Sequence, residues 1–325
     1  MDATFADKTV EQFSDQQIHV AFGVDANYFR GMGVTITSVV KNNPDLHFIF
    51  HVFAFHVSDD NRRRIGQLEA ELDSTINIHV LSTDLLQAFR KFPCFGQHSL
   101  GTFIRLLIPN SLQGIASKVL YLDSDILCFG SIADLLITDL TDCIAAVAHD
   151  EADTTVKTQT SALRLKHGQY FNAGVMYINV ENWIANDTQN SALKILTTQE
   201  LVFADQDALN MALDGKTRYI DDKWNYRYHL VDYLIKGETR LSVPDSFVLM
   251  HFTGPVKPWH NWCLHEVKAI FIQYQSASSW SDVPLDAPRT SRELKLFSKF
   301  LIKQNRIASG VFWHLKYWGV RLRRT

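Results

Sequence analysis

Short apolar runs alternate along this chain with longer stretches in which apolar residues recur every three or four positions. The first pattern predicts buried β-strands and the second predicts amphipathic helices. Helices are expected after Phe29 and, rich in charge, around Arg62–Leu72. The expected strands are Ile18–Val24, His47–Phe55, Ile76–Leu81, Val119–Leu122, Ile144–Ala148 and Phe171–Val180, the last of them central. Strands that alternate with helices predict an α/β fold with a mainly parallel central sheet and helices on its faces.

The pattern changes near residue 276. A Ser-rich stretch at residues 276–281, followed by Pro284 and Pro288, predicts a linker, and the residues beyond it have a helical pattern. We therefore expect an N-terminal tail at residues 1–17, a globular body at residues 18–275, and a linker with a C-terminal helical extension at residues 276–325.

The composition is that of an ordinary folded protein. Of the 325 residues, 46% are hydrophobic and 21% are charged. No run reaches the roughly 18 apolar residues that span a bilayer, and the acidic N-terminus lacks the features of a signal peptide. The four cysteines, at positions 94, 128, 143 and 263, lack the spacing of a zinc site or a disulfide framework, so a reducing cytoplasm fits best.

Positive charge is concentrated at the C-terminus. From Ser291 onward nine Lys or Arg face one acid, Glu293, which gives a net charge of +8 and leaves −11 on the other 290 residues of a chain whose total is −3. The split predicts an acidic body with a tail that seeks an anionic surface. An acidic body repels a phosphate backbone, so the tail is not expected to bind nucleic acid.

The tail also has an apolar stripe. Basic residues at 292, 295, 299, 303 and 306 recur every three or four positions, beside Leu294, Phe297 and Leu301. Beyond Gly310 lie aromatic residues of the kind that favour a membrane headgroup boundary, namely Phe312, Trp313, Tyr317 and Trp318. The rival interpretation is that the stripe packs against the body while the basic residues face water.

Two carboxylates directly follow a predicted strand. In Lys118–Asp125 the apolar strand runs into Asp123 and Asp125, separated only by Ser124. A turn at a strand end lets both carboxylates aim at one point, and hard oxygen ligands suit Mg²⁺ or Mn²⁺ with a diphosphate. Taken alone, the motif also fits a solvated turn that caps a helix near Ile132.

A second polar cluster follows an apolar run at Leu249–His260. His251 is a candidate third ligand, and a nitrogen donor favours Mn²⁺ over Mg²⁺. Gly254 allows the backbone to approach a ligand closely, and Lys257 offers a point charge to a phosphate.

With these segments identified, the chain resembles glycosyltransferase family 8, the retaining nucleotide-sugar enzymes with a GT-A, Rossmann-like fold. The resemblance covers roughly residues 18–265. Within the family, the chain is most similar to the bacterial enzymes that add hexoses to the outer core of lipopolysaccharide. It implies that residues 18–275 are a GT-A catalytic domain, with a UDP-sugar as donor. Five motifs in the family's order carry it: Val20–Tyr28, Tyr121–Asp125, Tyr170–Asn179, Asp205–Asn210 and His251–His260.

The loop after the first strand is the expected nucleotide site, because ligands of open α/β sheets bind at the carboxyl ends of strands. Gly23 leaves room for a base, Asp25 can accept from uracil or ribose, and Tyr28 offers a stacking face. The resemblance implies the same roles for Asp25, Asn27 and Tyr28, with uridine as the base. An ordinary turn in which Asp25 and Asn27 cap the next helix is the simpler alternative.

Further donor contacts follow from the resemblance. Arg105 matches an arginine that faces the diphosphate and sugar, and Gln97 matches a polar donor-site position. Ser124 is also expected to contact the donor. The residues expected to read sugar hydroxyls are Asp150, Asn172, Asp205 and Gln206, whereas Asp207 is expected to cap its helix.

The chemistry expected is transfer with retention. A diphosphate neutralised by metal and Lys257 can depart without a general acid. Gln206 lies where a covalent nucleophile would stand, and an amide is a poor one, which favours a short-lived ion pair attacked from the leaving-group side. Covalent action by Asp150 or Asp205 stays open.

We therefore expect a metal-dependent enzyme that moves glucose or galactose from a UDP-sugar to the lipopolysaccharide outer core. It would work in the cytoplasm, peripherally on the anionic inner face of the membrane. The alternatives are a protein-directed (glycogenin-like) or other glycan-directed family 8 glucosyltransferase, and a non-catalytic surface-binding protein of the same fold.

Overall fold

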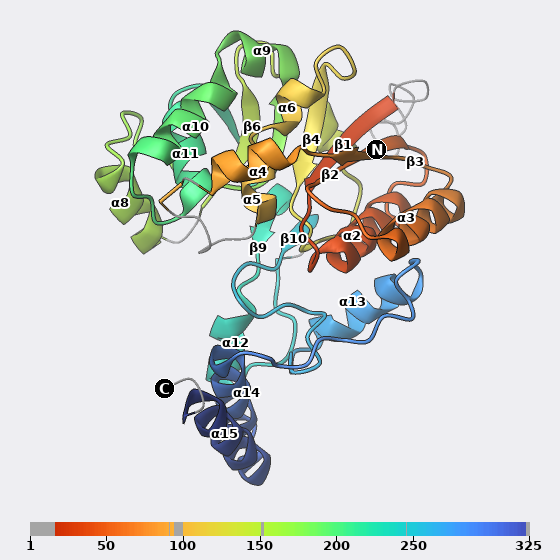
Figure 1. The fold of residues 1–325 in the computed structure, drawn as a ribbon, viewed down its shortest axis with the longest axis vertical. Helices are drawn as coiled ribbons and strands as arrows, with labels where there is room; N and C mark the ends of the chain where they lie inside the picture. The colour runs from red at the N-terminus through yellow and green to blue at the C-terminus, as the bar shows by residue number, and fades with distance from the viewer. Residues whose placement is uncertain (1–16, 91, 94–99, 151–152, 245, 323–325) are drawn as a thin grey trace, which may run out of the picture.

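The computed structural model describes residues 17–322, apart from residues 91, 94–99, 151–152 and 245. The expected tail before Gln17 and the candidate Gln97 lie outside the described residues. The chain forms a layered α/β body with a group of C-terminal helices at one end (Figure 1). The predicted fold class is confirmed.

A seven-stranded sheet forms the centre of the body, in the order β3-β2-β1-β4-β7-β6-β8. The pairs β1–β2, β2–β3, β1–β4 and β6–β8 are parallel, whereas β7 runs antiparallel to both β4 and β6. The strand expected to be central is therefore central, although it opposes its neighbours. The strand bounds are β1 Gln17–Gly23, β2 His47–Ala54, β3 Thr75–Val80, β4 Lys118–Leu122, β6 Ala145–His149, β7 Phe171–Asn179 and β8 Thr217–Ile220.

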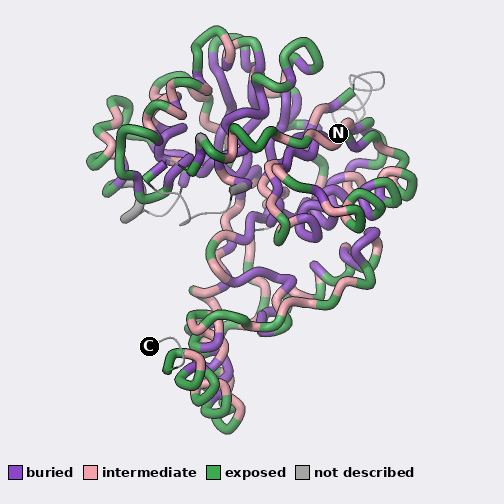
Figure 2. The backbone as a smooth tube through the Cα atoms, in the orientation of Figure 1, coloured by how far each residue is buried: buried purple, intermediate pink, exposed green. Residues whose placement is uncertain are grey.

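Helices cover both faces of this sheet, each over its own buried cluster of apolar side chains. Alternate residues of β1 divide between the faces: Val20 and Phe22 pack toward α2 and α3, and Ala21 toward α5 and α11. Figure 2 shows the buried residues concentrated in this interior. The helix bounds are α2 Phe29–Lys41, α3 Asp59–Leu72, α4 Thr83–Phe89, α5 Leu100–Ile104, α6 Ile108–Ser111, α7 Ala133–Leu136, α8 Asp153–Ala162, α9 Val180–Ala185, α10 Thr188–Thr198 and α11 Ala204–Ala212.

The strand order reverses at β1. This strand pairs on one side with β2 and on the other with β4, and all three are parallel. Crevices at such reversals, outside the carboxyl ends of the strands, are where α/β sheets bind ligands. The reversal brings the loop after Gly23 and the residues after Leu122 to the same edge of the sheet.

A small second sheet continues from this edge. It has the order β5-β10-β9, in which β10 (Leu249–His251) runs antiparallel to β5 (Ile126–Cys128) and parallel to β9 (Tyr226–Arg227). A short 3₁₀ helix, η1 (Asp222–Asn225), leads into β9. Because β5 begins directly after Asp125, this sheet brings the end of β10 to the end of β4.

The segment expected to be a linker is packed against the body. It follows α13 (Val267–Ser276), and Trp280 within it is 2% exposed. A side chain at Gly33 of α2 would lie 2.3 Å from the Trp280 ring, so the ring fills a notch that only glycine leaves open. Arg64 of α3 donates to the carbonyl of Ser279 at 2.6 Å and to the carboxylate of Asp282. These contacts fix the segment over α2 and α3.

The C-terminal residues form a helical hairpin, α14 (Ser291–Lys303) and α15 (Ile307–Leu322), which extends from the end of the molecule beyond α12 (Leu230–Lys236) (Figure 1). Thr290 and Glu293 form a capping box at the start of α14. Leu294 and Leu301 of the expected apolar stripe are buried, on a helix that packs mainly against α15. In the part of the chain that the structure describes, no helix is long and apolar enough to cross a membrane.

Three histidines on adjacent strands are joined by ring hydrogen bonds. His51 of β2 pairs with His19 of β1 at 2.9 Å and with His79 of β3 at 3.0 Å, measured between ring nitrogens. His51 is 1% exposed. Burial, with His19 and His79 beside it, lowers the pKa of His51 from 6.5 to about 4. The ring is therefore neutral in the folded protein at neutral pH.

This buried histidine predicts a loss of stability in acid. Below pH 6.5 the unfolded chain takes up a proton on His51, while the folded chain stays neutral until about pH 4. The contribution of neutral His51 to the unfolding free energy is complete above pH 6.5 and is lost as the pH falls from 6.5 toward 4. Between about pH 7 and about pH 5, His51→Gln should lose on the order of 1 kcal/mol less unfolding free energy than the wild type in denaturant titrations.

The matched control is His47→Gln, at the exposed start of the same strand. It should lose as much stability over that pH interval as the wild type. Equal pH dependence in both variants would contradict the role given to His51.

Candidate metal centre and adjoining cavities

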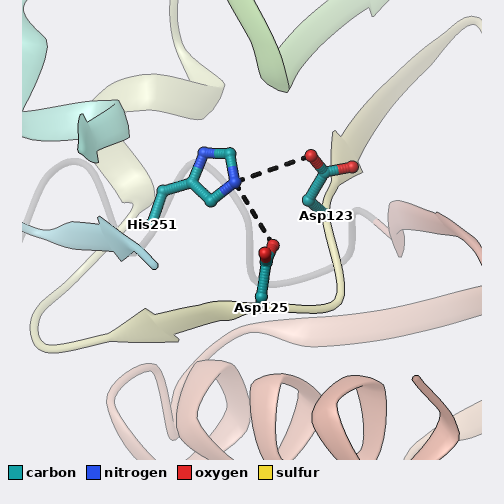
Figure 3. Close-up of side chains that lie close together, drawn as sticks. All are labelled: Asp123, Asp125 and His251. Carbon is teal, nitrogen blue, oxygen red and sulfur yellow. Dashed lines mark ion pairs between the residues drawn. The ribbon is translucent and has the colours of Figure 1, made fainter. Parts of the chain in front are cut away.

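Asp123, Asp125 and His251 converge on one point (Figure 3). The Nε2 atom of His251 lies 3.2 Å from Asp125 Oδ1 and 3.6 Å from Asp123 Oδ2. One ligand atom from each residue lies within 4.8 Å of the other two. Among the described residues, this is the one group of three or more His, Cys, Asp or Glu side chains with the spacing of a metal site.

Backbone hydrogen bonds explain the convergence. The amide of Asp123 donates to Gly174 O of β7 at 2.8 Å, and the amide of Phe252 donates to Asp125 O at 2.9 Å. His251 is paired in register with Ile126, which directly follows Asp125. The two sheets therefore bring together side chains from two segments that are far apart in the sequence.

The ring of His251 is oriented by an amide. Its Nδ1 lies 3.0 Å from Oδ1 of Asn225, whose Nδ2 donates to Asn172 Oδ1 at 3.0 Å. With Nδ1 donating to Asn225, Nε2 carries the lone pair that faces the carboxylates. Asn225 was missed in the sequence, because nothing in its local pattern distinguishes it from any polar residue beside an aromatic one.

One oxygen of each carboxylate is already bound by protein. Asp125 Oδ2 accepts from Lys257 Nζ at 2.5 Å, which leaves Oδ1 toward His251. Asp123 Oδ1 accepts from Tyr121 at 2.6 Å and pairs with Arg105 at 3.0 Å, which leaves Oδ2 toward His251. The two remaining oxygens and the imidazole nitrogen form a ligand set of hard and borderline donors.

The buried charges stabilise one another. Burial would raise the pKa of Asp125, but Lys257 and His251 hold that pKa well below its usual value. Burial would lower the pKa values of Lys257 and Arg105, yet the aspartates beside them keep both raised. Asp125, Lys257 and Arg105 are therefore held ionised. Lys257, expected to face a phosphate, is engaged with Asp125 and with the carbonyl of Phe252.

The donor set suits a divalent cation such as Mg²⁺ or Mn²⁺. Two carboxylate oxygens and an imidazole nitrogen would face the cation, and the protein cations Lys257 and Arg105 lie on the outer oxygens. The hydroxyl of Ser124, between the two aspartates, is buried and has no hydrogen-bond partner among the described residues. An unpartnered buried hydroxyl is consistent with a ligand binding here.

A cavity of about 760 Å³ opens beside this centre. It is lined by three of the expected sugar-reading residues, Asp150, Asn172 and Gln206, and on its far side by His229, Asp232, Tyr233 and Lys236 at and within α12. Asp150 is paired with Arg227, another residue that the sequence did not single out. Asp205 lies outside the lining and is paired with Arg105 at 2.9 Å.

The amide of Gln206 is fully engaged. Its Oε1 accepts from Asn172 Nδ2 and from the backbone amide of Ala173, each at 3.1 Å. Its Nε2 donates to Asp150 Oδ2 and to the hydroxyl of Tyr170, again at 3.1 Å. Asp207 accepts from the backbone amide of Phe203 at the start of α11, which agrees with its expected capping role.

The expected nucleotide loop lies on the other side of the centre. Asp25 Oδ1 accepts from the amide of Asn27 at 2.8 Å and so forms a turn, but the N-cap residue of α2 is Tyr28, with no side-chain capping hydrogen bond. Tyr28 packs edge-on against Trp259. A side chain at Gly23 would lie 2.6 Å from the carbonyl oxygen of Gly101, so close backbone packing, rather than room for a base, requires glycine there.

A second cavity, of about 310 Å³, lies against this loop. Asn27, Tyr28 and Lys257 line it. Gly254 lines both cavities, has a φ of +83°, and passes so close to His229 that a side chain would lie 2.2 Å from its ring. Only glycine satisfies both conditions, and the backbone at this position separates the two cavities.

Comparisons with known proteins agree with this architecture. The family profile described as "Glycosyl transferase family 8" matches residues 19–263, and the one described as "Glycosyl transferase family 8 C-terminal" matches residues 267–319. A lipopolysaccharide 1,3-galactosyltransferase of Salmonella typhimurium is 32% identical, over 97% of this chain and 95% of its own. A lipopolysaccharide 1,2-glucosyltransferase of Escherichia coli K12 is 33% identical, over 90% of this chain and 88% of its own.

Solved structures show the same fold. The galactosyltransferase LgtC, crystallised in complex with donor and acceptor sugar analogs, superposes with a TM-score of 0.63. It is 26% identical and covers 81% of this chain and 96% of its own. The GT-A fold expected from the resemblance is therefore confirmed.

The metal centre predicts a strict requirement for glycine at position 174. A methyl group there would lie 2.2 Å from Cε1 of His251 and 2.5 Å from its Nδ1. Gly174→Ala should therefore turn the ring away from the carboxylates and weaken Mn²⁺ binding at least about tenfold. Electron paramagnetic resonance of free Mn²⁺ measures this directly.

Gly66→Ala is the matched control, because a methyl group at Gly66 of α3 meets nothing within 4 Å. It should bind Mn²⁺ as the wild type does. Wild-type affinity in Gly174→Ala would mean that His251 is not a ligand.

Proposed function

The chain belongs to glycosyltransferase family 8, and we propose that it moves glucose or galactose from a UDP-sugar to the outer core of lipopolysaccharide, with retention and with a divalent metal. The glycosyltransferase activity follows from the family. The lipopolysaccharide acceptor is supported by two relatives that match most of their own length. Because one is named a galactosyltransferase and the other a glucosyltransferase at nearly equal identity, both hexoses stay in the proposal.

The observation that carries the proposal is the set of three open ligand atoms, close to two cavities that are both lined by Gly254, three residues after His251. Asp123 Oδ2, Asp125 Oδ1 and His251 Nε2 face one another while the remaining carboxylate oxygens are bound by protein cations. A divalent cation held there, with Mn²⁺ preferred because of the imidazole, would act as a Lewis acid toward the departing diphosphate.

The two cavities provide places for the two parts of the donor. The cavity beside Asn27 and Tyr28 suits the nucleotide, since the phenol offers a face to a base. Asp25, in the same loop but outside the cavity lining, offers an acceptor to uracil or ribose. The larger cavity suits the hexose, with Asp150, Asn172 and Gln206 as hydroxyl readers, and it extends to α12, where the acceptor would lie.

The hydrogen bonds of the site favour a mechanism without a covalent intermediate. Gln206 has both donors and its acceptor oxygen engaged. Asp150 is paired with Arg227 and Asp205 with Arg105, and a carboxylate held by a guanidinium is a weakened nucleophile. We favour an oxocarbenium–diphosphate ion pair in which a departing phosphate oxygen takes the acceptor's proton.

The proposed place of action is the cytoplasmic face of an anionic membrane. One face of α15 is apolar and between 49% and 70% exposed at Ile307, Val311, Leu315 and Leu322, with Trp318 at 44%. Lys316 lies over the rings of Phe312 and Trp313, and Arg321 lies over that of Trp318. An apolar face bordered by cations and aromatics suits a headgroup region, where each basic residue contributes about 1 kcal/mol.

The function is tested by transfer. Purified protein with Mn²⁺ should transfer hexose from UDP-glucose or UDP-galactose to truncated core lipopolysaccharide, read by mass and linkage analysis of the product. Asp125→Asn should lower the rate more than about a hundredfold, because metal stabilisation of the leaving group amounts to several kcal/mol. A chelator should abolish activity, and Mn²⁺ should restore it better than Mg²⁺.

Asp134→Asn, an exposed aspartate in α7, is the control and should keep full activity. Thermal unfolding checks that Asp125→Asn remains folded with Lys257 unpaired, and Asp123→Asn provides a second variant. Full turnover in the presence of the chelator would contradict the metal-dependent mechanism.

Membrane binding is tested on the exposed face of α15. The double variant Leu315→Gln/Trp318→Gln should lower binding to phosphatidylglycerol-containing vesicles more than about tenfold, because it removes apolar contact area. Sedimentation with the vesicles measures binding. Transfer to a soluble oligosaccharide acceptor should be unchanged.

The control is Ile137→Gln/Val202→Gln, which alters exposed apolar residues of the body. It should sediment with the vesicles as the wild type does. If the α15 variant sediments equally well, this face is not the membrane contact.

A further inference from the structure

We propose that residues 284–293, the segment leading into α14, form one wall of the nucleotide cavity, and that Arg289 binds the phosphates of the donor. The inference rests on the proposed function, because it assigns the smaller cavity to the nucleotide. It gives the C-terminal region a part in donor binding, separate from contact with a membrane.

The lining of the cavity carries the inference. One side consists of Asn27, Tyr28, Gly254 and Lys257, which the sequence already associates with the nucleotide. The opposite side is made by residues that lie beyond the family's main profile, namely Asp286, Ala287, Arg289, Thr290 and Glu293. Without this segment the cavity would lack one wall.

The wall is held firmly in place. Arg30, two residues after Tyr28, donates to Pro284 O at 2.7 Å and to Asp286 Oδ2 at 2.5 Å. The amide of Asp286 donates to Trp259 O, and Asp286 O accepts from the amide of Asn261, each at 3.0 Å. The wall is thus joined to both of the segments that form the opposite side.

Charge identifies Arg289 as the phosphate-binding residue. The carboxylate of Asp286 is paired with Arg30, and that of Glu293 accepts from the amides of Arg289 and Thr290. Lys257 is engaged with Asp125. The Arg289 side chain is 74% exposed, and its ion pair with Asp286 Oδ1 is a loose one, at 3.6 Å.

A guanidinium so placed matches the chemistry of a diphosphate. It offers several N–H donors in a planar fork that binds phosphate oxygens in pairs. The exposed side chain can turn toward the cavity without breaking a buried contact. Arg105 and Lys257 are already paired with the aspartates of the metal centre. An additional cation on the cavity wall would therefore balance the negative charge that the nucleotide brings.

The test compares two arginines three residues apart. Arg289→Ala should weaken UDP binding about tenfold in calorimetry with Mn²⁺, since a charge-assisted contact is lost. Uridine, measured by ligand-observed NMR titration, should bind Arg289→Ala as it binds the wild type. Arg292→Ala, on the exposed first turn of α14 and outside the cavity lining, should leave both affinities unchanged.

The outcomes separate this inference from the proposed function. Wild-type UDP affinity in Arg289→Ala overturns the inference, and an equal loss for uridine and UDP overturns the phosphate assignment. If the wild type does not bind UDP but binds another nucleoside diphosphate, the proposed donor is wrong, and the same comparison with that nucleotide decides the role of Arg289.

Discussion

The site depends on the pairing of two buried aspartates with two buried cations. Asp123 and Asp125 lie at the end of an apolar strand, where unpaired carboxylates would be costly. Arg105 and Lys257 each bind one oxygen of one carboxylate, and the second oxygens are thereby left facing His251. The same contacts connect segments that are far apart in the chain, so the ligand set exists only where these segments pack together.

The elements that the sequence predicts well are those determined by local pattern. The expected strand beginning at Ile18 matches β1 to within a residue at each end, and the ligands follow strands that were recognised as apolar runs. The convergence of Asp123, Asp125 and His251 was predictable from their residue types, and the structure shows that it arises because β10, in the second sheet, pairs with β5, which directly follows Asp125. The antiparallel direction of β7 was not predictable, since an apolar run in the sequence does not indicate which way its strand runs.

What the sequence did not reveal are partnerships between distant segments. Asn225 orients His251 and Arg227 pairs with Asp150, yet each is an unremarkable polar residue in its own stretch. Trp280 gave no sign that it would enter the notch at Gly33, because the surrounding serines and prolines have the composition of a linker. Such contacts are set by tertiary packing, which local propensity does not encode.

The notch at Gly33 has a consequence for exchanging parts between relatives. A chimera joined at residue 276 would bring in a foreign segment 277–290 whose bulky residue must match a glycine on the recipient's α2. A junction after Thr290 would instead retain the native Trp280, Asp282 and Asp286 contacts and transfer only the helical hairpin. The unit that can be exchanged is therefore smaller than the C-terminal region as the sequence divides it, and it must still match the packing of Phe300 against Trp262.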